Sequence, residues 1–211
     1  MNALPFLDRE SAGHALAAAL APLAGKEALV LAIPRGGVPV GRVVADRLDA
    51  DLDVVLVRKI GAPGNPEFAI GAVDEQGHVH LQRHAAQSGA GEAYIEERAA
   101  AELARIRQRR ERYGHGRPPA PVAGRTVIVV DDGLATGATM AAALQAVRAG
   151  KPAHLVCAVP VAARDSLAAV ARHADAVVCL ATPSPFEAVG LHYLRFPQVD
   201  DDEVLALLAH R

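Results

Sequence analysis

Apolar and polar residues along the chain follow two periodicities, which together predict alternating helices and buried strands. Apolar residues at helical spacing predict helices over 7–23, 38–48, 138–149 and 163–174. Continuous aliphatic runs predict buried strands over 28–34, 52–60, 126–131, 154–161 and 176–182. Strands that are buried on both faces and joined by helices are typical of parallel sheets. The predicted fold is therefore α/β, with a mostly parallel, twisted sheet and helices on both of its faces.

One predicted domain spans residues 1–211 and carries two additions, an excursion at 61–123 and a C-terminal segment at 183–211. Within the excursion the sequence predicts a flexible Gly/Pro loop at 61–73, two short strands at 68–81 and a charged helix at 92–113. The interpretation of these additions rests on composition and turn residues, because their apolar pattern is weaker than that of the core.

Composition excludes several classes of function. With 22 basic and 24 acidic residues the formal net charge is −2, so no global field favours nucleic acid or an anionic membrane. Cys157 and Cys179 lie inside aliphatic runs, which is typical of core thiols in a reducing compartment. The sequence shows neither a signal peptide nor an apolar run long enough to span a bilayer. We expect a cytoplasmic protein without nucleic-acid or membrane partners.

The stretch "TVIVVDDGLATGAT" at 126–139 holds the strongest chemical signal in the chain. Asp131 and Asp132 stand where its aliphatic strand ends, and ligands of parallel sheets bind at the carboxyl ends of the strands. Two carboxylates repel a phosphate placed directly on them, so they are better suited to vicinal hydroxyls or to a divalent metal. A helix cap joined to an ordinary turn is the alternative, and it explains only one of the two acids.

The loop that follows the acids predicts a phosphate cradle. Gly137 allows the backbone to approach a ligand closely, while Thr136 and Thr139 offer hydroxyl donors. The helix that begins next presents free amides and a dipole that favour an anion. Together with the acidic pair, this loop indicates a site for a sugar phosphate.

The same stretch resembles the signature of the type I phosphoribosyltransferases, in which an aliphatic strand, an acidic pair and T-G-x-T follow one another. The resemblance implies a Rossmann-like fold in which Asp131 and Asp132 bind the ribose hydroxyls of phosphoribosyl pyrophosphate (PRPP). It also implies that one loop binds the 5-phosphate, namely Ala135, Thr136, Gly137, Ala138 and Thr139. Gly133 departs from the pattern, because many members carry a bulky aliphatic residue there, and we expect a looser loop.

The stretch "IPRGGVPVG" at 33–41 offers a bare backbone and one fixed positive charge, which suit a pyrophosphate. It resembles the pyrophosphate loop of the same family, in which Arg35 acts in catalysis and Gly36 and Gly37 bind substrate. The resemblance also implies a non-proline cis peptide bond before Arg35. An ordinary strand-to-helix turn with a surface arginine is the alternative.

Arg58 and Lys59 end the second predicted strand and precede the Gly/Pro loop at 61–73. They resemble the basic strand end and the flexible catalytic loop of the family. On this reading Arg58 binds substrate, Lys59 neutralises charge on the departing pyrophosphate, and loop closure excludes water. A solvated basic pair and a plain loop are the alternative.

The resemblance implies that a nitrogen acceptor, expected to be a nucleobase, displaces pyrophosphate from PRPP. Mg²⁺ is expected to bind through PRPP and water rather than through protein ligands, and a homodimer is expected. The segment 183–211 is expected to form a hood over the acceptor, where Phe186 and Tyr193 stack on a base or pack in the ordinary way.

Two other classes of function compete with a transferase. A regulatory protein on the same fold keeps the PRPP or nucleotide pocket without turnover. Phosphotransfer and phosphatase domains also place acids after an aliphatic strand, but on the first strand, and haloacid-type enzymes use Asp-x-Asp. In this chain the acids are adjacent and late, and no P-loop string G-x-x-x-x-G-K-[ST] occurs.

Two further patterns carry less weight. His78, His80 and His84 have a spacing that can bring two imidazoles to one strand face, but no carboxylate or thiol is expected to join them as a metal site. The basic run at 105–114 is accompanied by glutamates on the same helical stretch. We expect it to be a solvated helix face or a subunit contact rather than a nucleic-acid site.

Overall fold

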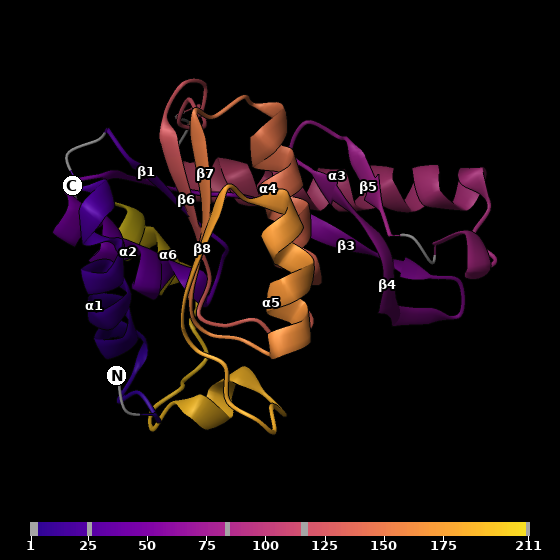
Figure 1. Cartoon of the computed structure of the whole chain (residues 1–211). Coiled ribbons are helices and arrows are strands. Elements are labelled where there is room, and N and C mark those ends of the chain that lie inside the picture. The colour runs from indigo at the N-terminus through magenta and orange to yellow at the C-terminus, as the bar shows by residue number, and fades with distance from the viewer. Residues whose placement is uncertain (1–3, 25–26, 83–84, 115–117, 210–211) are drawn as a thin grey trace.

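The computed structural model describes residues 4–24, 27–82, 85–114 and 118–209. At its centre lies a sheet of five parallel strands in the order β2-β1-β6-β7-β8 (Figure 1). The strands are β1 Leu29–Ala32, β2 Asp51–Val54, β6 Thr126–Val130, β7 His154–Val161 and β8 Ala176–Ala181. The predicted α/β class and parallel sheet are confirmed.

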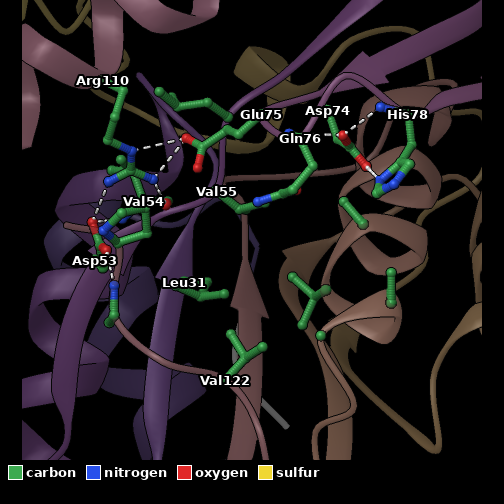
Figure 2. A pocket seen from close by; sticks show the side chains of 17 residues that line it. Leu31, Asp53, Val54, Val55, Asp74, Glu75, Gln76, His78, Arg110 and Val122 are labelled. Atoms are coloured by element: carbon green, nitrogen blue, oxygen red, sulfur yellow. Dashed lines mark hydrogen bonds and ion pairs between the residues drawn. The ribbon is translucent and has the colours of Figure 1, made fainter.

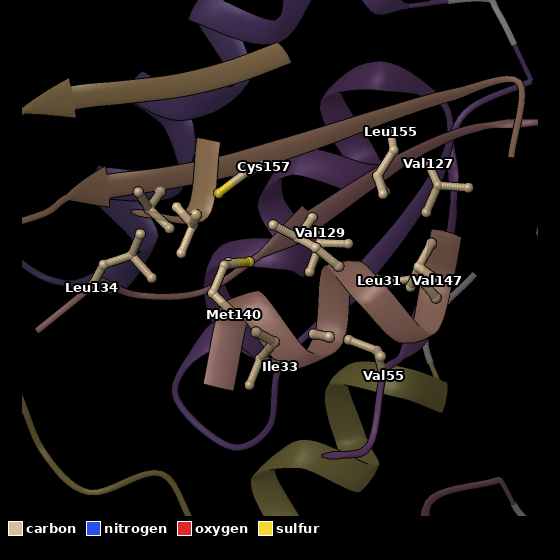
Figure 3. Packing of buried hydrophobic residues seen from close by; sticks show 14 of the residues in the cluster. Leu31, Ile33, Val55, Val127, Val129, Leu134, Met140, Val147, Leu155 and Cys157 are labelled. Atoms are coloured by element: carbon tan, nitrogen blue, oxygen red, sulfur yellow. The ribbon is translucent and has the colours of Figure 1, made fainter. Parts of the chain in front are cut away.

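Helices cover both faces of this sheet, because its strands are apolar on both sides. The helices α1 Arg9–Leu20 and α2 Gly37–Leu48 lie on one face, and α4 Ala138–Ala149 and α5 Arg164–Val170 lie on the other (Figure 1). Along β1, Val30 belongs to the core beneath α1 and α2, whereas Leu31 belongs to the core beneath α4. Figure 3 shows the second core, where Val129 of β6 meets Met140 of α4. The period of two along each strand therefore serves two separate cores.

A second, antiparallel sheet lies beside α4 in the order β3-β4-β5 (Figure 1). Its strands are β3 Val57–Ala62, β4 Asn65–Asp74 and β5 Val79–Leu81, and the long helix α3 Glu92–Gly114 packs against β3 and β4. The predicted hairpin around the Asp-Glu-Gln-Gly turn at 74–77 and the predicted charged helix are confirmed. Short 3-10 turns complete the described chain at Ala21–Leu23, Ala85–Gln87, Ala171–His173 and Val189–His192.

The predicted single strand at 52–60 is wrong, because the chain changes sheets in its middle. The amide of Val55 still donates to Ala32 O at 3.1 Å, but β1 ends there and offers no further partner. Val55 then packs in the core beneath α4, while the next residue, Leu56, packs in the core of the second sheet. A continuous apolar run carries no mark of this switch, since both halves are buried.

The predicted loop at 61–73 is also formed differently. Residues of this segment continue β3 and build β4, and the two strands are joined through Pro63 and Gly64. The register of the hairpin shifts between Ile60 and Ala62. The pairing is therefore irregular in the part of the hairpin that is richest in Gly and Pro. A paired hairpin, rather than an unstructured lid, therefore follows Arg58 and Lys59.

The C-terminal segment returns to the core and ends in α6 Asp201–Ala209, which the sequence pattern did not predict. This helix packs against α2 and α3, with Val204 fully buried. Cys157 and Cys179 are both free thiols, and burial raises the pKa of Cys157 to about 12. Within the described residues no helix is long and apolar enough to cross a membrane.

Candidate active site

The acidic pair stands at the carboxyl end of β6, in the middle of the parallel sheet. The amide of Asp132 donates to Asp131 Oδ1 at 2.9 Å, which turns the chain out of the strand. Burial and the neighbouring Asp132 charge raise the pKa of Asp131 well above its usual range. Burial also raises the pKa of Asp132, while Arg9 opposes that rise. A cation or hydroxyl donors placed here would relieve the crowding of two partly desolvated carboxylates.

The loop after β1 packs directly against these acids. A Cβ atom on Gly36 would collide with Asp132 Oδ2, and one on Gly37 would lie 2.7 Å from Val130 O. Only glycine therefore permits this approach of the two loops. The peptide bond between Pro34 and Arg35 is cis, as the resemblance implied. The two glycine positions and the acidic pair form one continuous edge of the site.

The loop after the acids leads into the N-terminus of α4. Gly137 is the residue that precedes this helix, with φ of 73°, and it provides no side-chain cap for the first amides. Ser166 donates its hydroxyl to Ala135 O at 2.5 Å and holds the outer part of the loop. Ala135 and Thr136 are exposed, while Ala138 and Thr139 are half-buried. Open amides at a helix N-terminus are suited to an anion.

Arg9, at the start of α1, completes the environment of the acidic pair. Its Nε donates to Asp132 Oδ2 at 2.8 Å, its Nη1 donates to Pro197 O at 2.7 Å, and its guanidinium stacks 3.7 Å from the centre of the Phe196 ring. Tyr193 donates its hydroxyl to the backbone oxygen of Asp132 at 2.6 Å. The start of the described chain and its C-terminal segment are thus both tied to one acidic residue.

Arg35 and Asp132 line one open cavity of about 460 Å³, together with Arg9, Gly36 and residues of the C-terminal segment. Arg35 also lies 4.0 Å from Asp201, the first residue of α6. The side chain of Arg35 is about one-third exposed, so it can reach a ligand in this cavity. A guanidinium and a carboxylate that line one cavity suit a phosphorylated ligand that also carries hydroxyls or a metal ion.

Comparison with known proteins identifies the architecture. A model of the phosphoribosyl transferase domain matches residues 9–194. The chain belongs to the phosphoribosyl transferase family. The crystal structure of TT1426 from Thermus thermophilus is similar, with a TM-score of 0.87, 49% identity, and coverage of 97% of this chain and 98% of that one.

Two proteins from Mycobacterium tuberculosis, strains CDC 1551 and H37Rv, are 47% identical over 98% of the chain. Their names class them provisionally as phosphoribosyl transferases. The chain spans only about half of their length, because the match covers 47% of each. They support membership of the phosphoribosyl transferase family, and their activity as whole proteins is a separate question.

Arg58 and Lys59, the two basic residues on β3, have different surroundings. Arg58 donates through Nε to Glu102 Oε2 of α3 at 2.6 Å, and it shares a small cavity with Pro34 and Thr139. Lys59 is exposed, and within the described part of the chain no contact joins it to the other candidate residues. Neighbouring strand residues point to opposite faces, and Arg58 is the one of the two that shares a cavity with Thr139 of the loop at 135–139. The catalytic role of Lys59 stays a prediction.

One detail of the sequence interpretation needs correction, and for Tyr193 the structure decides between two alternatives that the sequence left open. A carboxylate does join the histidines, since Asp74 Oδ2 lies 3.2 Å from His78 Nδ1 and 2.9 Å from His80 Nε2. His84 lies outside the described residues, and within them no group of three or more His, Cys, Asp or Glu side chains suits a metal ion. Tyr193 is buried among aromatic side chains, so it packs in the ordinary way and does not present a stacking face.

The basic run on α3 is likewise not a solvated face throughout. Arg110 and Arg112 pair with carboxylates of other elements, Asp53, Glu75, Asp201 and Asp202. These pairs, like that of Arg9 with Asp132, join residues far apart in the chain. Local spacing in the sequence does not indicate such ion pairs. The sequence pattern therefore did not identify Arg9 as a residue of the site.

Proposed function

We propose that this domain transfers the 5-phosphoribosyl group of PRPP to a nitrogen acceptor, expected to be a nucleobase, with release of pyrophosphate. The observation that carries the proposal is the contact between Gly36 and Asp132, which brings the loop suited to pyrophosphate against the acids suited to ribose. The phosphate loop at the N-terminus of α4 follows the same acids after a few residues. One PRPP molecule needs these three elements at a single sheet edge.

The residues take distinct roles in this proposal. Asp131 and Asp132 accept hydrogen bonds from the ribose hydroxyls, and the loop of Ala135, Thr136, Gly137, Ala138 and Thr139 donates amides and hydroxyls to the 5-phosphate. Arg35 and Lys59 neutralise charge that develops on the departing pyrophosphate, with Gly36 and Gly37 providing the bare backbone beside it. Arg58 supports the phosphate end of the substrate.

Mg²⁺ fits the donor set of this site. Two adjacent carboxylates with raised pKa values favour a nearby cation, and the described residues offer no third ligating side chain beside them. This is the pattern expected when Mg²⁺ is held mainly by substrate oxygens and water, with at most one or two protein carboxylates. When bound, the ion would neutralise pyrophosphate charge, and the protein would position the ribose and exclude water.

Pyrophosphate release tests the proposal directly. The protein is incubated with PRPP, Mg²⁺ and each member of a panel of nucleobases, and released pyrophosphate is measured with and without the base. Release that depends on one base is the expected result and names the acceptor. Tight PRPP binding without release for any base would instead favour a non-catalytic regulatory protein on the same fold. Arg47→Met, at an exposed position near the end of α2, is a matched control that should keep full activity.

A further inference from the structure

A second cavity of about 250 Å³ lies between the two sheets, and it shares no lining residue with the cavity beside Arg35 and Asp132. Its floor is apolar, formed by Leu31, Val55, Val122 and Val147. The turn at 74–78 and Arg110 of α3 form its polar side (Figure 2). The volume is roughly that of eight water molecules in the liquid, enough for a single ring with one substituent.

Two carboxylates and a backbone carbonyl surround the single arginine of this cavity. Arg110 donates through Nε to Glu75 Oε1 at 2.9 Å, through Nη1 to Asp53 Oδ1 at 2.8 Å, and through Nη2 to Val54 O at 2.6 Å. A contact of 2.7 Å also joins Nη2 to Glu75 Oε1. A phosphate or carboxylate ligand would therefore meet carboxylates rather than a free guanidinium, so the cavity is not a second phosphate site.

Two of the three carboxylates that line the cavity are fully engaged. Asp53 accepts from Arg110 and Val54 N on one oxygen and from Ala120 N at 2.8 Å on the other. Asp74 accepts two backbone amides on Oδ1 and lies within hydrogen-bond distance of two imidazoles on Oδ2. Both oxygens of each aspartate therefore already have a hydrogen-bond partner within the protein.

Glu75 is the exception. Arg110 engages only its Oε1, and among the described residues no hydrogen bond reaches Oε2. In Figure 2 this second oxygen points away from Arg110, toward Val54 and Val55 at the edge of the cavity. The side chain is only 15% exposed, and burial raises the pKa of Glu75. A half-paired, partly desolvated carboxylate beside an apolar floor favours a ligand that carries a positive charge.

We propose that this cavity binds a small, largely apolar organic cation, such as an aryl amidine or a ring-bearing amine, whose N–H groups donate to Glu75 Oε2. The ring lies on Leu31, Val55 and Val147, and the side chain of Gln76, which extends toward Val55, covers its outer edge (Figure 2). The site is independent of the proposed transferase chemistry.

The position of the cavity links it to the other sheet. Val55 and Leu56, which join β2 to β3, line both this cavity and the small cavity that holds Pro34, Arg58 and Thr139. An occupant therefore touches the connection that sets the position of the β3–β4 hairpin relative to the parallel sheet. A bound ligand would therefore contact the two residues that lead directly into β3, the strand that carries Arg58.

Benzamidine is a suitable probe, because it joins one aromatic ring to a cationic group with paired N–H donors. Titration into the full chain, followed by methyl NMR, should give saturable shifts at Val55, Val122 and Val147. Neutral benzamide has nearly the same shape and keeps an N–H donor, but it lacks the positive charge and the second donor nitrogen, so it should bind roughly tenfold more weakly.

Two variants test the two halves of the site. Glu75→Gln removes the charge but leaves Asp53 to hold Arg110, and it should weaken benzamidine binding about tenfold. Ala146→Leu keeps the charge and fills the space beside α4, so it should weaken both probes. Glu111→Gln, at an exposed position on α3, is the matched control and should change neither.

Three results would overturn the proposal. They are an absence of saturable binding at millimolar benzamidine, equal affinity of the parent protein and Glu75→Gln, and shifts that map away from the cavity. Methyl signals remote from the cavity report whether each variant is folded. If Glu75→Gln fails to fold, Ala146→Leu and the comparison of benzamidine with benzamide still decide the question. Loss of transferase activity plays no part in either outcome.

Discussion

Arg9 Nε donates a hydrogen bond of 2.8 Å to Asp132 Oδ2, across 123 positions of sequence. Both side chains are largely withdrawn from water, with 10% and 13% of their surface exposed. The arginine also holds Pro197 and stacks on Phe196. One guanidinium thus fixes a carboxylate expected to bind ribose and the segment expected to border the acceptor.

This relationship predicts a pH effect. Burial raises the pKa of Asp132 and Arg9 opposes that rise, so Arg9→Met should raise the pKa of Asp132 further. In the proposed function the ionised carboxylate accepts the ribose hydroxyls, and in this variant that ionised form would be lost at a higher pH. We expect the acidic limb of PRPP affinity, measured by calorimetry across pH, to move to higher pH. An acidic limb unchanged from that of Arg47→Met would contradict the role given to Arg9.

Asp131→Asn is expected to stabilise the fold while it weakens ligand binding. The folded-state pKa of Asp131 lies above its ordinary value of 3.8, so the folded protein binds this proton more tightly than the unfolded chain. The contribution to stability is therefore present below pH 3.8 and is lost as pH rises toward the folded-state pKa. At neutral pH the variant should therefore gain unfolding free energy relative to the wild type.

Denaturant unfolding at neutral and acidic pH measures this effect. The gain should shrink as the pH falls, because the aspartate then carries its proton in the folded and unfolded states alike. A gain that is equal at both pH values, or a loss at neutral pH, would contradict the raised pKa. PRPP affinity of the same variant should fall, since one of its two carboxylate acceptors becomes an amide.

Gly36→Ala should disrupt the site more than the fold. The added Cβ collides with Asp132 Oδ2, so either the loop at 33–37 or the acid must move. We expect PRPP affinity to fall at least about tenfold. Gly91→Ala provides a matched control, because nothing lies within 4 Å of a Cβ at that position. Similar PRPP affinities for the two variants would argue against close apposition of loop and acid.

Arg35→Ala should distinguish the two ends of the substrate. Arg35 lines the cavity that also holds Gly36 and Asp132, and no residue of the loop at 135–139 lines that cavity. Removal of its guanidinium should therefore weaken pyrophosphate binding more than ribose-5-phosphate binding. The two affinities are measured by competition with PRPP. Equal losses for both ligands would refute the assignment of this loop to pyrophosphate.

The sequence predicted most of what lies along one strand or loop, and little of what depends on distant contacts. The parallel sheet, the acids at the end of β6 and the cis bond before Arg35 follow from local patterns and a family resemblance. The switch from β2 to β3 does not, because Val55 and Leu56 are buried in different cores and look alike in sequence.

Ion pairs between distant residues were the second feature that the sequence did not predict. Arg9 with Asp132, and Arg110 with Asp53 and Glu75, join elements that only the tertiary fold brings together. The basic run on α3 therefore looked like a solvated face, although Arg110 is only 15% exposed. Charge spacing along a helix reports which residues share a face, but it does not report what covers that face.

Calorimetric titration of PRPP with Mg²⁺ into the wild-type domain and into Asp132→Asn, under identical conditions, tests the central claim most directly. We predict saturable binding to the wild type and an affinity at least about tenfold lower for the variant, with the fold of the variant intact by thermal unfolding. No binding to the wild type, or equal affinity for the two proteins, would contradict the assignment of the acidic pair to the ribose of PRPP.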